Sequence, residues 1–121
     1  MDAFNKKQYL NLETKRKNGE VVCTPVWFVS GETELFFTTE PGSGKVKRIR
    51  RDPHVRVAPC KVNGDLLGDW HAATARFLSA EEGQRVNQLM TRKYGLMKSL
   101  FELFRSNRNS PSCFIALHLK D

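Results

Sequence analysis

The feature that most constrains the fold is a succession of short segments rich in Val, Phe, Thr and aromatic residues, separated by turn sequences. Such segments are typical of β-strands. Lys17-Asn18-Gly19-Glu20, Ser30-Gly31-Glu32 and Asn63-Gly64-Asp65 suit hairpin turns, so the strands between them are expected to be antiparallel. The spacing indicates a barrel or a sandwich. The predicted strands are residues 9–14, 21–30, 34–39, 55–62, 70–78 and 113–119.

Two helical segments interrupt these strands. In residues 44–52, Val46 and Ile49 lie three positions apart among cations, and Pro53 ends the segment. A longer helix begins after Ser79, which has the spacing of a capping box with Glu82. Its apolar stripe consists of Val86, Leu89, Met90, Leu96, Met97, Leu100, Phe101, Leu103 and Phe104, with Gly95 as a break or kink. We therefore predict one domain over residues 1–121, mainly β with helices, built as a six-stranded antiparallel barrel.

The composition excludes several classes of protein. No run of about 18 apolar residues occurs, and the apolar core segment of a signal peptide is absent near Met1. We therefore expect neither a membrane span nor a secretion signal, and a cytoplasmic location. Cys23, Cys60 and Cys113 are widely spaced in apolar segments, which favours free thiols over disulfides. The three histidines are equally scattered, and the sequence predicts no metal site.

A glycine-rich turn followed by a run of cations stands out in the segment TTEPGSGKVKRIRRDP, residues 38–53. Three readings compete: a nucleotide-binding P-loop, a basic patch for nucleic acid, and a pocket for a phosphorylated cofactor. A P-loop requires glycine where this chain has Thr39, and Ser or Thr where it has Val46. The net charge of +7 fits an anionic partner, but no helix-turn-helix, aromatic RNA-binding signature or zinc spacing is present. Any nucleic-acid binding is therefore expected to be non-specific and steeply salt-dependent.

The third reading has a physical basis, because the turn opens into a helix whose N-terminal N–H groups attract a phosphate. Thr39 and Ser43 supply hydroxyl groups, Gly42 and Gly44 allow close approach of the backbone, and Lys45 supplies a charge. A plain strand-turn-helix with a serine cap and a solvated basic helix is the alternative. Lys47, Arg48, Arg50 and Arg51 add more charge than one phosphate needs, so a longer polyanion is favoured.

The stretch VVCTPVWFV, residues 21–29, carries Pro25 inside a predicted strand. Proline lacks the N–H that a sheet ladder uses, which marks an edge, a bulge or a place where another partner takes the hydrogen bonds. A planar ring against this strand would pack on Val26 or Trp27. Core packing of Trp27 and Phe28 is the equally favoured alternative.

Taken together, TPVWFV, FFTTEPGSGKVKRIRRDPHVRVAPC and KYGLMKSLFELF resemble the split β-barrel flavin and deazaflavin oxidoreductases, the superfamily of pyridoxamine 5′-phosphate oxidase. The chain is most similar to the short group that depends on the deazaflavin coenzyme F-420. The resemblance implies a homodimer with a cofactor in each of two grooves between the barrels. It implies that the cofactor ring lies on Thr24, Pro25, Val26 and Trp27, and that Thr39, Ser43 and Lys45 hold the phosphate. The oxidases themselves have arginine where this chain has Gly44, and a longer C-terminal segment, so their own activity is not expected.

In such proteins a hydride passes between the cofactor ring and a conjugated small-molecule substrate, and much of the catalysis is positioning. The extra cations favour coenzyme F-420, which carries a phosphodiester and a polyglutamate tail, over FMN. A non-catalytic carrier or sensor of flavin, haem or tetrapyrrole is the alternative. No side chain is assigned a catalytic role. The predicted cofactor-binding residues are Thr24, Pro25, Val26, Trp27, Thr38, Thr39, Ser43, Gly44, Lys45, Arg48, Arg50, Cys60 and Trp70.

Overall fold

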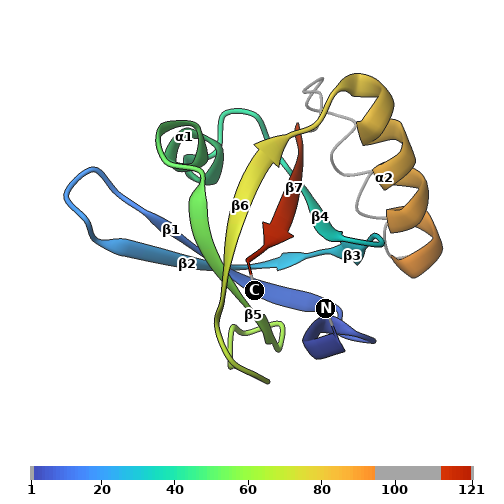
Figure 1. Ribbon diagram of the computed structural model, residues 1–121, viewed down its shortest axis with the longest axis horizontal. Helices are drawn as coiled ribbons and strands as arrows, with labels where there is room; N and C mark the ends of the chain where they lie inside the picture. The colour runs from blue at the N-terminus through green and yellow to red at the C-terminus, as the bar shows by residue number, and fades with distance from the viewer. Residues whose placement is uncertain (1, 95–112, 121) are drawn as a thin grey trace.

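A computed structural model describes residues 2–94 and 113–120, which form one curled antiparallel sheet and two α-helices (Figure 1). The order of neighbouring strands is β2-β1-β5-β6-β7-β4-β3. A short 3₁₀ turn, Asp2–Phe4, precedes the sheet. The strands are β1 (Tyr9–Lys15), β2 (Val21–Trp27), β3 (Val29–Ser30), β4 (Glu34–Thr39), β5 (His54–Cys60), β6 (His71–Phe77) and β7 (Cys113–Leu119), and the helices are α1 (Gly44–Arg51) and α2 (Ala80–Tyr94).

The predicted strand 21–30 is divided at Phe28, so the sheet has seven strands in place of the six expected. The Phe28 side chain is fully buried and its ring packs edge-on against Phe4, with ring centroids 5.8 Å apart. Its backbone N–H donates to the hydroxyl of Tyr94 on α2 at 3.0 Å. The strands on either side, β2 and β3, form the two edges of the sheet, which places Pro25 on an edge strand, the first of the three predicted alternatives.

The three predicted turns are confirmed. Gly19 and Gly64 have positive φ values of 90° and 95°, a conformation that favours glycine. The turn between β3 and β4 is closed by a hydrogen bond from the Gly31 N–H to the Glu34 carbonyl, at 2.7 Å. The predicted strand 55–62 ends earlier, at Cys60, because the Lys61 N–H bonds across the following turn to Asp65.

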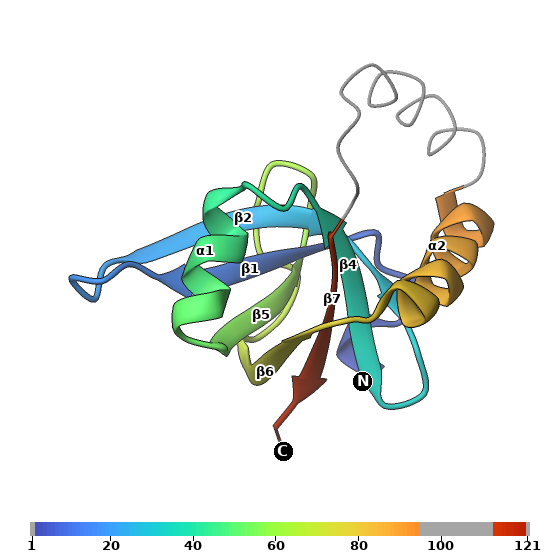
Figure 2. The same ribbon diagram turned by 90° about the horizontal axis from the view of Figure 1, so that it is seen from above.

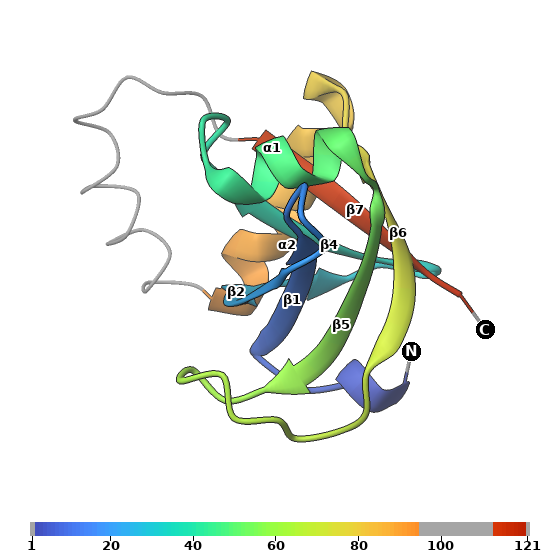
Figure 3. The same cartoon turned by 90° about the vertical axis from the view of Figure 1, so that its left-hand side faces the viewer.

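The main core lies inside the curl of the sheet. It consists of alternate side chains from the strands together with Val46 and Ile49, which α1 presents to it as the spacing predicted. The core residues include Phe4, Leu10, Leu12, Phe28, Leu35, Phe37, Val55, Val57, Ile115 and Leu117. Helix α1 thus covers one end of the half-barrel, while the loop between β5 and β6 lies at the other end (Figure 3).

Helix α2 packs on the outer face of the sheet, beside β3 and β7 (Figure 2). A second apolar cluster forms there around Val29, Val86, Met90 and Tyr94. The predicted capping box is present, because the Glu82 N–H donates to Ser79 Oγ at 3.2 Å and the Ser79 N–H donates to Glu82 Oε1 at 3.1 Å. The predicted break at Gly95 and the apolar positions after it lie outside the described residues.

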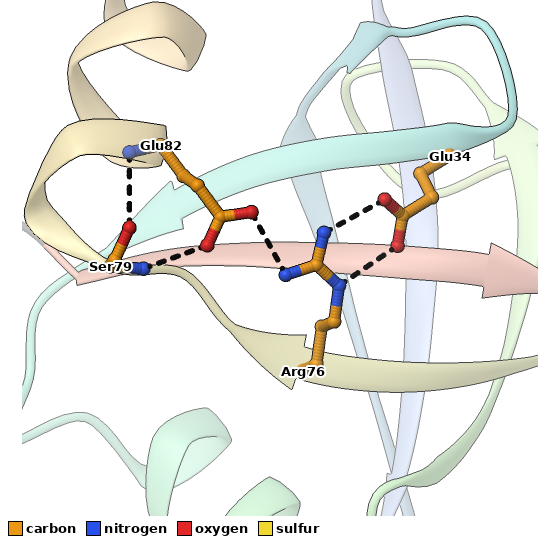
Figure 4. A network of polar contacts seen from close by, with 4 residues as sticks. All are labelled: Glu34, Arg76, Ser79 and Glu82. Carbon is orange, nitrogen blue, oxygen red and sulfur yellow. Dashed lines mark hydrogen bonds and ion pairs between the residues drawn. The ribbon is translucent and has the colours of Figure 1, made fainter.

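An arginine on β6 ties this helix start to the sheet (Figure 4). Arg76 Nη2 lies 3.0 Å from Glu34 Oε1 on β4, and Arg76 Nη1 lies 3.1 Å from Glu82 Oε2 on α2. The Glu82 carboxylate therefore serves both the helix cap and this ion pair.

In the part of the chain that the structure describes, no helix is long and apolar enough to cross a membrane.

Candidate functional site

The turn between β4 and α1 brings two hydroxyl groups together at a helix N-terminus. Ser43 is the N-cap of α1, and its Oγ accepts a hydrogen bond from the Val46 N–H at 3.4 Å. Thr39 Oγ1 lies 3.3 Å from Ser43 Oγ. The pair therefore lies beside N–H groups that carry a partial positive charge, which is an arrangement suited to a phosphate group.

Cations surround this helix start. Lys45 is half-buried, and burial followed by repulsion from Arg48 lowers the pKa of its ammonium group, while Glu40 acts in the opposite direction. The Arg48 side chain folds back over Gly44, where a Cβ would lie 2.7 Å from Arg48 Nη1. Gly44 thus leaves room for the guanidinium group beside the helix N-terminus.

Arg48 is fixed by a neighbouring strand. Its Nε donates to Thr14 Oγ1 on β1 at 2.6 Å. Burial, and then repulsion from Arg16 and Arg51, lower the pKa of its guanidinium group. Arg51 in turn donates to the Lys15 carbonyl. We call Lys45, Arg48, Arg16 and Arg51 the α1 cation cluster. The mutual repulsion within it makes an anion the favoured ligand.

Sequence reasoning missed two members of this arrangement, Arg16 and Thr14. Thr14 lies at the end of β1 and Arg16 directly follows the strand, which reaches α1 only because the sheet curls. No local signal identifies them in the sequence, since their proximity to Arg48 depends on the tertiary fold.

The four predicted ring contacts on β2 lie on two faces of the sheet. Thr24 and Val26 pair with Leu12 and Leu10, whose side chains point into the core, so these two face the inside of the curl. Pro25 and Trp27 pair with Asn11 and Tyr9 and therefore face outward. Trp27 stacks on Tyr94, with ring centroids 4.8 Å apart and an interplanar angle of 13°. Val26 packs against the core inside the curl, and Thr24 and Val26 both remain partly exposed on this edge strand.

Four other predicted site residues lie away from the α1 N-terminus. Cys60 is buried and ends β5 opposite Tyr9, and Trp70 directly precedes β6. Both adjoin the loop between β5 and β6, which lies at the end of the half-barrel remote from α1 (Figure 3). Thr38 donates to the Cys113 carbonyl at 3.2 Å, on the opposite face of β4 from Thr39. Arg50 lies on the other side of α1 from Arg48, with its guanidinium carbon 5.4 Å from the centre of the Phe77 ring. The structure therefore gathers Thr39, Ser43, Gly44, Lys45 and Arg48. Thr24 and Val26 lie on the inner face of the sheet, as Thr39 does.

The outer face holds an ion pair that the sequence did not reveal. Arg56 on β5 binds Glu13 on β1 through two hydrogen bonds, of 2.8 and 2.6 Å, and its guanidinium carbon lies 5.0 Å from the centre of the Trp70 ring. The Glu13 side chain is only 7% exposed, so its charge depends on this partner. The hydrogen bond from Arg56 holds the pKa of the Glu13 carboxyl group below its ordinary value of 4.5, against the opposing effect of burial.

This ion pair predicts a loss of stability in acid. Because the unfolded chain binds a proton to Glu13 more readily than the folded one, the stabilisation is present above about pH 4.5 and is lost as the pH falls through the lower folded value. Urea midpoints measured from pH 7 down to pH 3 should show this decline. In Glu13→Gln the decline should be shallower over the same range, and an unchanged slope would contradict the assignment.

No family model and no curated protein sequence matches the chain. Solved structures do match it over nearly its whole length. The heme storage protein HutZ from Vibrio cholerae has a TM-score of 0.75 at 12% identity, covering 99% of this chain and 87% of HutZ. A putative pyridoxamine 5′-phosphate oxidase from Listeria innocua has a TM-score of 0.70 at 15% identity, covering 99% and 90%. An F420-H2-dependent reductase has a TM-score of 0.68 at 16% identity, covering 92% and 94%.

These likenesses establish the fold. The chain has the split β-barrel fold of pyridoxamine 5′-phosphate oxidase-like proteins, as its sequence motifs predicted. The fold is common to proteins described as reductases and to one described as a heme storage protein. Fold alone therefore does not assign the function of this chain.

Proposed function

We propose that the protein is an oxidoreductase that binds a flavin-type cofactor, coenzyme F-420 in preference to FMN, and transfers hydride to or from a conjugated small molecule. The observation that carries this proposal is the α1 N-terminus, where two adjacent hydroxyl groups, a half-buried lysine and the α1 cation cluster converge. The resemblance of the sequence motifs and the reductases that share the fold support the same reading.

The residues present fit the cofactor's anionic end. Thr39 and Ser43 would donate hydrogen bonds to a phosphate, and Lys45 would neutralise its charge. Thr24 would lie beside the ring at the partly exposed border of the β2 edge, where Val26 packs against the core. When bound, the cofactor supplies the hydride chemistry, and the chain contributes orientation and exclusion of water. No described residue is assigned proton transfer.

The preference for coenzyme F-420 rests on the cations beyond Lys45. Arg48, Arg16 and Arg51 extend positive charge from the α1 N-terminus toward β1, which a phosphodiester and a tail of carboxylates would use and the single phosphate of FMN would not. Arg50 lies on the other side of the helix, over the Phe77 ring, and is not proposed to contact the cofactor.

We further propose a homodimer, because β2 is an edge strand and a ring lying on it needs a second wall. Sedimentation velocity with cofactor present should give a dimer. A monomer at micromolar concentration would count against a groove shared by two barrels.

A titration of the purified protein with coenzyme F-420, FMN and haemin, followed by absorption and fluorescence, tests the proposed function. Saturable binding of F-420, tighter than that of FMN, is the expected result. Saturable binding of haemin alone would instead support the carrier function suggested by the likeness to HutZ. Binding of none of the three would overturn both.

A further inference from the structure

A cavity of about 700 Å³ lies between α1 and α2, on the side of α1 away from the cation cluster. Its volume is within the range of about 300–1,000 Å³ that is typical of small-molecule sites. Figure 2 shows α1 and α2 on either side of β6 and β7. The last residue of β6, Phe77, and the first two of β7, Cys113 and Phe114, line the cavity. The proposed cofactor contacts on β2 do not line it.

The walls combine aromatic rings with a few polar groups. Phe77 on β6 and Phe114 on β7 supply the rings, and Gln84 and Asn87 on α2 supply amides. Phe114 reaches α2 only because position 83 is glycine, since a Cβ there would lie 2.7 Å from the Phe114 ring. The fold therefore brings a flat apolar surface and hydrogen-bonding groups to one place.

Arg50 is the only charged residue among the described residues that line this cavity. Its guanidinium group lies over the Phe77 ring, and stacking on one face leaves the N–H groups at the edge available. None of the ion pairs among the described residues includes Arg50, whereas Arg76 is held by Glu34 and Glu82. Arg50 is thus a positive charge at an aromatic wall with no carboxylate bound to it from the described chain.

Several groups at the start of α2 are already occupied. The N–H groups of Ser79, Glu82 and Gly83 are already bonded within the first turn, and the Glu82 carboxylate is bonded to Arg76 (Figure 4). Arg50 is therefore the charged group among the described lining residues that a negative group in the cavity would meet.

We propose that the cavity between α1 and α2 binds a planar aromatic or conjugated carboxylate, with the carboxylate on Arg50 and the ring between Phe77 and Phe114. A guanidinium fork matches a carboxylate in two hydrogen bonds, and the rings favour a flat ligand. This inference concerns a second site and does not depend on cofactor binding.

The experiment uses 2-naphthoate as probe and 2-naphthamide as its uncharged counterpart, each titrated calorimetrically into the full-length protein. The acid is expected to bind more tightly than the amide. Arg50→Gln should weaken 2-naphthoate binding about tenfold, the loss of one charged hydrogen-bonding contact, and should leave the amide unchanged. Arg48→Gln removes the same charge from the other side of α1 and should have little effect.

Thiol labelling gives an independent readout. Cys113 lines the cavity and is partly exposed, while Cys23 lies on β2 and is exposed. 2-Naphthoate should slow the labelling of Cys113 by a thiol reagent and leave that of Cys23 unchanged. Equal binding of acid and amide, equal losses in the two arginine variants, or no protection of Cys113 at saturating probe would each overturn the proposal.

Discussion

Replacing Lys45 by alanine is expected to weaken cofactor binding by about 1.5–3 kcal/mol, or roughly ten- to a hundredfold, the range for a hydrogen bond to a charged group. Lys45 is half-buried beside the hydroxyl groups of Thr39 and Ser43, so water screens its charge less than that of a surface lysine. The loss should be similar for coenzyme F-420 and FMN, because both carry the group that this end of the site is proposed to hold. Fluorescence titration measures it.

Lys47→Ala is the matched control, because this lysine is exposed two residues further along the same helix. It should change the affinity little. Arg48→Gln then separates the two cofactors. It should lower the affinity for F-420 more than the affinity for FMN, and it should reduce the salt dependence of F-420 binding. Equal losses of affinity for both cofactors would contradict the proposal that the α1 cation cluster binds the tail of F-420. An unchanged affinity in Lys45→Ala would contradict the phosphate site itself.

Replacing Tyr94 by phenylalanine is expected to lower the free energy of unfolding by about 1–3 kcal/mol, the cost of leaving a buried polar group unpaired. The Tyr94 hydroxyl accepts the Phe28 N–H at 3.0 Å and lies 2.6 Å from the Phe28 carbonyl and 2.7 Å from the Gln8 carbonyl. Phe28 is the break between β2 and β3 and has no sheet partner for its N–H. The substitution removes only the oxygen, so packing of the ring against Trp27 is retained.

Urea denaturation measures this effect as a lower midpoint at an unchanged slope. Tyr9→Phe is the control, because the Tyr9 ring also lies near Trp27, with centroids 6.4 Å apart, but its hydroxyl bonds to no described residue. A comparable loss in both variants would show that the Tyr94 hydroxyl adds nothing specific.

Most of the fold could be predicted from the sequence because its signals are local. The alternation of apolar residues in strands, the glycines of the turns and the serine caps of both helices depend on neighbours a few positions apart. The break at Phe28 could not be predicted, because the group that replaces its sheet partner, the Tyr94 hydroxyl, is 66 residues away in the chain.

The candidate site was predictable where it is one continuous segment. Thr39, Ser43, Gly44 and Lys45 follow one another through a turn into a helix, and the structure keeps them together. Because side chains alternate along a strand, the sequence already places Thr24 and Pro25 on opposite faces of the sheet. Which of the two faces lies toward α1 depends on the curl of the sheet. Cys60 lies far from α1 because it ends β5, whose first residue follows the helix closely, and Trp70 because antiparallel β6 begins on that far side. Arg48 and Arg50 diverge because residues two apart on a helix point to different sides, toward Thr14 and Phe77 here.

The position of β7 has a consequence for how the chain folds during synthesis. This strand follows the six others in the described sequence, yet it lies between β6 and β4 and hydrogen-bonds to both. Until Cys113–Leu119 leave the ribosome, β4 and β6 each present an unpaired edge, and the β3–β4 hairpin has no ladder joining it to the other strands. Closure of the sheet must therefore follow translation of these residues. The nascent chain depends on this late strand to cover surfaces that would otherwise pair with other chains.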